Sequence, residues 1–179
     1  HEQGKINCHN GVVDLETLEL QPHSAKYLFL GKLPIEYDPE ADCPVWKEFL
    51  NTTLEDKHIP TLQEFIGYCL IPDTRFQKAL MLYGTGANGK SIVINTINAL
   101  FGREYTSHVS LSTLQSNRFA AYELIGKLVN TSSETANYTG KELDMFKAIV
   151  SGDDVFVESK GVAGSSTKLF ARLIFASNT

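Results

Sequence analysis

The sequence lacks the features that mark several classes of protein. Its three cysteines, Cys8, Cys43 and Cys69, are an odd number at wide spacings, which fits neither a disulfide framework nor a paired CxxC metal site. No window approaches the roughly 18 uninterrupted apolar residues of a membrane span, and the first residues do not resemble a signal peptide. We therefore expect reduced, structural cysteines in a soluble, cytoplasmic protein with no membrane partner.

Positive charge is also scarce. The chain has 16 Lys and Arg residues against 21 Asp and Glu, a formal net charge of −5. A protein that coats nucleic acid without sequence preference needs clustered Lys and Arg against the phosphates. Any contact of this chain with nucleic acid must therefore be local.

The 179 residues, 42% of them hydrophobic, are enough for one packed core and a smaller module. Residues 5–20 predict a β-hairpin, because Asn10-Gly11 is a strong turn dipeptide flanked by apolar residues. A proline-punctuated connector follows, as far as Pro44. We therefore expect a first domain over residues 1–44, made of the hairpin and this connector.

The apolar spacing changes after Pro44. Apolar residues over 45–54 and again over 62–70 fall on one helical face, which predicts two amphipathic helices within a helical segment 45–76. Residues 79–83 then predict a short buried strand, directly before a glycine-rich turn. We expect this strand to open the main core, residues 77–179.

The turn after this strand matches the phosphate-binding P-loop at every fixed position. It lies between a predicted strand and a predicted helix, which makes the alternative, a purely structural turn, an unlikely coincidence. Glycines allow backbone N–H groups to wrap phosphates, Lys90 is expected to reach the β and γ phosphates of ATP, and the Ser91 hydroxyl is expected to hold Mg²⁺. The predicted nucleotide-binding residues are Gly84, Thr85, Gly86, Ala87, Asn88, Gly89, Lys90 and Ser91.

A P-loop enzyme also needs an acid near the end of another strand, to order the metal and polarise the attacking water. A strand predicted over 127–133 places Glu134 just beyond its end, so Glu134 is the candidate metal or water ligand. The alternative is that Glu134 is a solvated loop carboxylate. Glu123 is a rival acid, but it lies at the wrong end of this strand.

The last apolar run, residues 169–176, predicts a third core strand that ends in Ser177-Asn178. A polar residue at the carboxyl edge of such a strand points into the crevice where open α/β sheets bind ligands. Asn178 is therefore a candidate to position the attacking water. The alternative is a simple turn residue.

Residues 151–166 predict a second hairpin, with Lys160 near its tip. Lys160 is a candidate to contact a phosphate, and the alternative is a solvated lysine on an exposed loop.

In this order, the glycine-rich loop, the acid, the hairpin and the terminal asparagine resemble a superfamily 3 helicase, one of the AAA+-like ring motors. The closer resemblance is to phage and plasmid DNA primases with a C-terminal helicase, relatives of the poxvirus primase-helicase. It covers nearly the whole chain. Residues 84–91 match motif A, residues 133–135 match motif B, and Asn178 matches the asparagine of motif C.

Other segments carry the resemblance further. Residues 10–15 and 37–41 are similar to the domain that precedes the ATPase in this family. Residues 62–70 are similar to the helix that leads into the ATPase, and residues 151–160 are similar to its DNA-facing segment. One departure concerns residues 161–166, which are small here, whereas the family carries basic and aromatic residues after the lysine. The resemblance implies that Lys160 contacts DNA, and this departure weakens the expected grip on DNA.

The resemblance implies an α/β fold with an AAA+-like ATPase core, in which helices flank a central parallel sheet. It implies ATP hydrolysis with Lys90, Glu134 and Asn178 as catalytic residues, coupled to movement along single-stranded DNA through the channel of a hexameric homo-oligomer. It further implies a phage- or plasmid-encoded protein in the cytoplasm of the bacterial or host cell. We expect further sequence on both sides, with a primase upstream and an arginine finger and a distal DNA-binding domain beyond Thr179.

Two other functions remain open. A P-loop kinase or nucleotide transferase needs a lid with several arginines over the phosphates, and after Ser91 the chain has only Arg103, Arg118 and Arg172, widely spaced. The second alternative is an ATP-binding oligomerisation module without motor activity, against which the intact Lys90, Ser91 and Glu134 argue.

Overall fold

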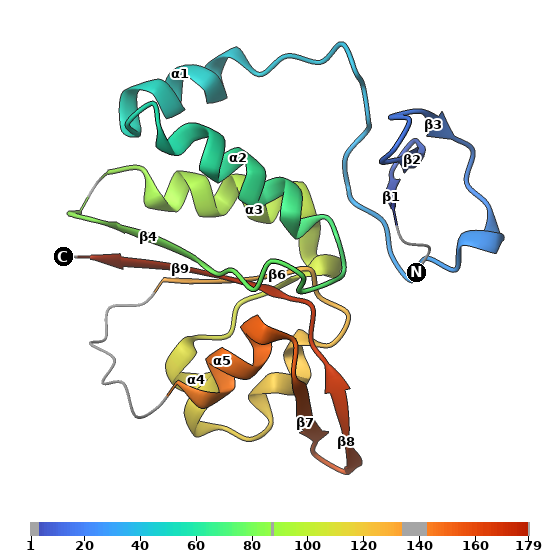
Figure 1. Cartoon of the computed structure of the whole chain (residues 1–179), viewed down its shortest axis with the longest axis vertical. Coiled ribbons are helices and arrows are strands. Elements are labelled where there is room, and N and C mark those ends of the chain that lie inside the picture. Colours follow the sequence, from blue (N-terminus) through green and yellow to red (C-terminus); the bar gives the residue numbers. More distant parts are fainter. Residues whose placement is uncertain (1–3, 87, 134–142, 179) are drawn as a thin grey trace. The chain divides into compact units, whose positions relative to one another are not determined.

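The computed structural model describes residues 4–86, 88–133 and 143–178 of the chain (Figure 1). These residues fold into two compact units, 1–71 and 72–179. Within the part of the chain that is described, none of the helices has both the length and the apolar character that a membrane span requires.

The first unit contains a small antiparallel sheet. Its strands, in the order β1-β2-β3, are β1 (Lys5–Cys8), β2 (Gly11–Asp14) and β3 (Leu20–Gln21). The predicted hairpin is confirmed, with Cys8 opposite Gly11 across the turn. A side chain at Gly11 would place its Cβ 2.6 Å from the carbonyl oxygen of Gln21, so this close approach of two backbones requires glycine.

The helices of the first unit are η1 (Ala25–Tyr27), α1 (Pro44–Thr53) and α2 (His58–Cys69). The two predicted amphipathic helices are confirmed. Helix α2 begins two residues before Pro60, which therefore lies in its first turn. A proline is tolerated there because the first N–H groups of a helix have no partner within the helix.

The second unit is built on a parallel sheet of four strands. In the order β4-β9-β6-β5, these are β4 (Leu80–Gly84), β9 (Arg172–Asn178), β6 (Val129–Ser133) and β5 (Thr106–Ser107). The last strand in sequence, β9, lies between the first, β4, and the third, β6. The sheet therefore joins segments that are far apart along the chain.

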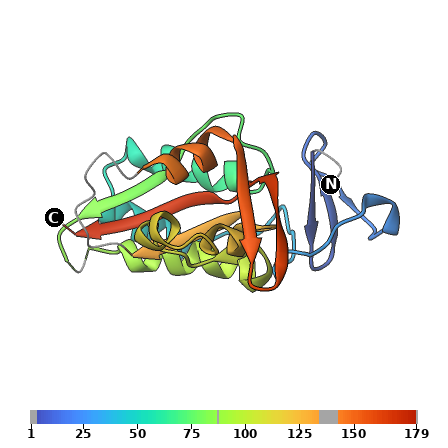
Figure 2. The same ribbon diagram turned by 90° about the horizontal axis from the view of Figure 1, so that it is seen from below.

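Helices cover both faces of this sheet (Figures 1 and 2). Helix α3 (Lys90–Tyr105) covers one face with Val93, Ile97 and Phe101 buried. The helices α4 (Leu111–Ser116), η2 (Ala120–Leu124) and α5 (Asp144–Ser151) lie on the other face. Leu173 and Phe175 of β9 pack into the core on this second face, which matches the period of two residues in a strand.

One prediction about these elements needs correction. Strand β4 is not a buried strand: Met81 is 50% exposed and Tyr83 is 69% exposed, because β4 is an edge strand of the described sheet. The predicted end of the helix at Phe101-Gly102 is confirmed, because Gly102 has the non-helical angles φ 67° and ψ 176°. One further turn follows this break and continues to Tyr105.

The second predicted hairpin is confirmed. It consists of β7 (Asp154–Ser159) and β8 (Val162–Lys168), which pair antiparallel. Val155 and Val157 on one face of β7 are buried in the core that contains Leu111 of α4 and Ile149 of α5. The opposite face of β7 is therefore directed away from this core.

Candidate nucleotide-binding site

The glycine-rich loop, residues 84–91, has the local structure that the sequence predicts. Strand β4 ends at Gly84 and helix α3 begins at Lys90. Gly89 occupies the N-cap with φ 82°, a left-handed conformation that favours glycine. Among the described residues, no side chain caps this helix, and its first turn contains no acidic residue. The first N–H groups of a helix have no partner within the helix, and a phosphate group is a suitable acceptor for them.

Lys90 is held inside this loop. Its Nζ donates hydrogen bonds to the carbonyl oxygens of Gly84 and Thr85 and to Oδ1 of Asn88, each at 2.8 Å. The lysine is half-buried. A positive charge is therefore fixed at the loop by three oxygens that phosphate oxygens can replace.

Asn88 and Gly84 lie against each other. A Cβ built on Gly84 would be 2.1 Å from Nδ2 of Asn88, so the absence of a side chain at Gly84 makes room for the asparagine. Thr85, Gly86 and Ser91 are exposed. Ala87 lies outside the described residues.

The ends of three parallel strands meet beside this loop. Gly84 at the end of β4 is the register partner of Asn178 at the end of β9. Ser133 at the end of β6 is the register partner of Ala176, two residues before Asn178. Because all these strands are parallel, their carboxyl ends lie together at one end of the sheet, the carboxyl edge. Open α/β sheets bind ligands at this edge.

Two of the three predicted catalytic residues can be placed at this edge. Lys90 lies in the loop and the exposed Asn178 is beside its first glycine. Glu134 follows Ser133 directly but lies outside the described residues, so its role stays a prediction. The rival acid Glu123 lies in η2, before β6 rather than after it.

The polar residues of β6 have a structural role that sequence reasoning missed. Asn130 is fully buried: its Oδ1 accepts from the N–H of Val109 and from Oγ of Ser107, and its Nδ2 donates to the carbonyl of Val109, at 2.8–2.9 Å. The side chain of Asn130 thus acts as the strand partner of Val109 after β5 ends. The only signal in the sequence was an unusually polar strand.

Thr131, the next residue of β6, connects the strand to α3. Its Oγ1 donates to Oδ1 of Asn98 at 2.8 Å and lies 3.0 Å from Nδ1 of His108. Thr131 is 2% exposed. The helix that begins at Lys90 and the strand that ends before Glu134 are therefore joined by a part-buried hydrogen bond.

The three arginines that follow Ser91 do not gather at the glycine-rich loop. Arg103 lies in the last turn of α3, beyond the break at Gly102 and thirteen residues after Lys90. Arg172 is buried at the start of β9, the end opposite to Asn178. Arg118 pairs with Glu158 of the hairpin, with 3.2 Å between Nε and Oε1.

Asp73 and Arg172 are charged residues at the opposite end of the sheet from the glycine-rich loop. Burial acts to raise the pKa of Asp73, but hydrogen bonds from the side chain and backbone of Arg75, with the nearby charge of Arg172, outweigh it. The pKa of Asp73 is therefore held below its usual range. These charges belong to the amino end of the sheet rather than to the candidate site.

Lys160 is exposed at the turn between β7 and β8, where Gly161 has φ 80°. The structure thus places the predicted DNA contact at the tip of the hairpin, on the side of the sheet that α4 and α5 cover.

Comparison with families of known proteins adds to this geometry. A model described as "Family of unknown function (DUF5906)" matches residues 82–179, which is more than half of the chain. The chain belongs to the DUF5906 family. A second model, "D5 N terminal like", matches residues 1–55 of this DUF5906 chain. No curated protein matches it significantly.

Solved structures of the NrS-1 C-terminal region share the fold of this DUF5906 chain. An apo structure of the NrS-1 C-terminal region is 22% identical with a TM-score of 0.58, over 81% of this chain and 35% of that one. An A-form apo structure of the same region is also 22% identical, with a TM-score of 0.57, over 81% of this chain and 34% of that one. A JCV helicase with a bound small molecule reaches 17% identity and a TM-score of 0.48, over 72% of this chain and 38% of that one. The chain spans about a third of the length of the NrS-1 region.

Proposed function

We propose that this chain is the ATP-dependent DNA helicase core of a phage- or plasmid-type replication primase-helicase, with an AAA+-like P-loop ATPase fold. The single observation that supports it most is the shared edge of the sheet. There the loop that contains Lys90, the exposed Asn178 and the end of β6 before Glu134 come together. The D5 N terminal like match of residues 1–55 supports the same family.

In this proposal, Lys90 exchanges its three oxygen partners in the loop for the β and γ phosphate oxygens of ATP. The exchange conserves charge-assisted hydrogen bonds and brings the lysine next to the charge that develops during phosphoryl transfer. The uncapped N-terminus of α3 donates backbone N–H groups to the same phosphates. Ser91 and Glu134 are the residues that would hold Mg²⁺, which neutralises phosphate charge when bound.

The attacking water is assigned to Glu134 and Asn178. Asn178 is on the strand next to the glycine-rich loop, and Glu134 follows the strand after that. A water between these strand ends faces the phosphates held at Gly84. In this assignment Glu134 polarises the water and Asn178 orients it.

The hairpin β7–β8 supplies the contact with single-stranded DNA in our proposal, with Lys160 at its tip against a phosphate. We further propose a homo-oligomeric ring, hexameric by the resemblance, in which ATP binds between subunits and hydrolysis moves the hairpin. The positions of Arg103, Arg118 and Arg172, all away from the glycine-rich loop, argue against a kinase lid.

The test is ATP turnover by the whole protein, measured with and without single-stranded DNA, beside Lys90→Ala and Lys160→Ala. We expect turnover to be lost in Lys90→Ala, and stimulation by DNA to be lost in both variants. Turnover that depends on Lys90 but never responds to DNA would refute the helicase proposal and indicate a P-loop enzyme with another substrate.

A further inference from the structure

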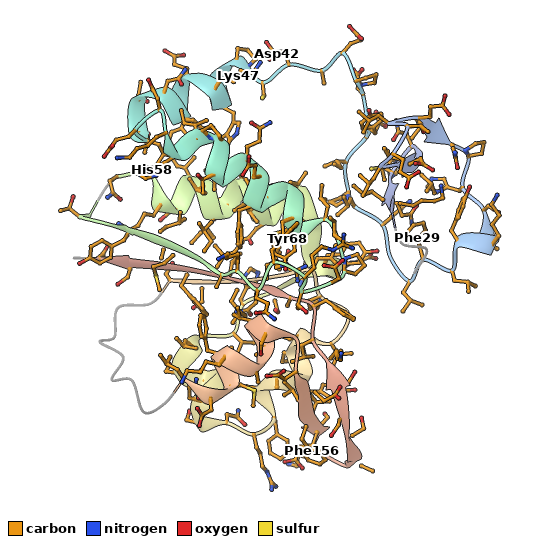
Figure 3. All side chains as sticks on the ribbon, viewed as in Figure 1. Phe29, Asp42, Lys47, His58, Tyr68 and Phe156 are labelled. Carbon is orange, nitrogen blue, oxygen red and sulfur yellow. The ribbon has the colours of Figure 1, made fainter. Side chains whose placement is uncertain are left out.

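The outward face of the β7–β8 hairpin exposes an aromatic ring. Phe156 lies on β7 between Val155 and Val157, which are buried, and is itself 59% exposed (Figure 3). Burial of this ring in the folded chain would contribute hydrophobic stabilisation, which exposure forgoes. A ring displayed in this way on a two-stranded hairpin is available to a partner.

The ring of Phe156 lies against the backbone of the neighbouring strand. Phe156 is the register partner of Ser166, and Gly164 is two residues before Ser166 in β8. A Cβ built on Gly164 would be 2.3 Å from Cζ of Phe156 and within 3.0 Å of both Cε atoms. The ring therefore lies across Gly164, and only the absence of a side chain there makes room for it.

The surroundings of the ring are small or polar. The positions that share its face are Asp154 and Glu158 on β7, and Gly164, Ser166 and Lys168 on β8. A docking surface for another protein typically surrounds an aromatic anchor with further apolar residues. A single flat ring with polar neighbours instead fits one flat, polar-edged group, such as a nucleobase.

The charges along the hairpin are suited to a polyanion. Lys160 is at the tip, four residues from Phe156 or about 13 Å along an extended strand. Lys168 is opposite Asp154 at the base, and Arg118 pairs with Glu158. Asp154 and Glu158 each have a cation beside them, so the exposed Lys160 gives the tip of the hairpin a positive charge, whereas the chain as a whole has a net charge of −5.

We infer that Phe156 is a stacking platform for a base of single-stranded nucleic acid, on the hairpin whose tip carries Lys160. The inference depends on the proposed function and assigns it a second contact of a different physical kind. Lys160 attracts the phosphates and its contribution is screened by salt, whereas stacking on Phe156 is sequence-tolerant and nearly independent of salt.

The test measures the affinity of the whole protein for a fluorescein-labelled oligothymidylate by anisotropy over a series of salt concentrations. We expect Phe156→Ala to weaken binding about 5- to 100-fold, the range for loss of one stacked base. Phe156→Leu, apolar but not flat, should lose most of the affinity as well, and Phe156→Tyr should keep it. ATP turnover without DNA should be unchanged in all three variants.

Salt dependence separates the two contacts. Lys160→Ala should reduce the slope of log K against log salt by about one phosphate contact, while Phe156→Ala should leave the slope as it is. If the wild type binds oligothymidylate well, and Phe156→Ala and Phe156→Leu bind it equally well, the inference is overturned while the proposed function stands. It is also overturned if these variants change the oligomeric state, measured by light scattering, and not the affinity, because the ring would then be a contact between proteins. If the wild type neither binds oligothymidylate nor responds to DNA, the proposed function itself is wrong.

Discussion

Lys90 and Lys160 show how differently this chain presents a positive charge in two regions. Lys90 is half-buried and bonded to three oxygens of its own loop, at the edge where three parallel strands end. Lys160 is exposed at the tip of a hairpin. The first lysine is positioned by backbone geometry and the second by its place on a surface. A charge held by hydrogen bonds, like that of Lys90, is in place before a ligand binds. The contact made by an exposed lysine depends on the residues around it.

The difference between the two lysines can be tested by removing each charge in turn. Lys90→Ala should reduce ATP turnover about 10²- to 10³-fold, the usual effect of losing one preorganised group that stabilises developing charge. Lys160→Ala, the matched control, should leave turnover without DNA unchanged and abolish its stimulation by DNA. Equal loss of DNA-independent turnover in both variants would show that Lys160 also belongs to the nucleotide site.

The sequence predicted the local features of both regions. The strand, turn and helix around Gly84–Ser91 are confirmed, as are both hairpins and the two helices of the first unit, because short-range turn chemistry and apolar periodicity specify them. No helix was predicted at the positions of α4 and α5. Ser110 gave a usable signal for α4, since its hydroxyl accepts from the N–H of Thr113 as an N-cap.

Features that depend on distant parts of the chain could not be predicted in the same way. The run 79–83 is apolar at every position, so its pattern does not distinguish an edge strand from a buried one, and the exposure of Tyr83 was missed. The position of β9 between β4 and β6 is set by tertiary packing. The burial of Asn130 depends on Val109, a residue of the loop between β5 and α4.

The rigidity of the carboxyl edge of the sheet, where the candidate nucleotide-binding site lies, can be tested by changing Thr131. Thr131→Val keeps the shape of the side chain but removes the donor to Asn98 and the hydroxyl beside Nδ1 of His108, leaving a part-buried acceptor without its bond. We expect the free energy of unfolding, from urea denaturation, to fall by about 1–2 kcal/mol. Thr96→Val is the matched control on the exposed side of α3, where the hydroxyl bonds to the carbonyl of Ile92 within its own helix. The control should change stability little.

If both threonine variants were equally stable, the part-buried bond between α3 and β6 would contribute nothing, and the edge would be positioned by apolar packing alone. If Thr131→Val also lowered the rate of ATP turnover at saturating nucleotide, the bond would position the end of β6 for catalysis. Lys160→Ala should show neither effect, which sharpens the contrast between the two regions.

The smallest expected effect concerns Asp73, at the end of the sheet away from the carboxyl edge. The pKa of Asp73 is lowered in the folded chain, so the ionised carboxylate contributes stability above its ordinary value near 3.8, and this contribution is lost as the pH falls through the lowered folded value. Asp73→Asn should therefore lower the free energy of unfolding at pH 7 by less than about 1 kcal/mol, because Arg75 is well exposed. Urea denaturation of both forms should show this difference shrinking once the pH falls below 3.8. A difference that grew in acid would mean that the carboxyl is favoured in its protonated form, and that Arg75 and Arg172 do not stabilise its charge.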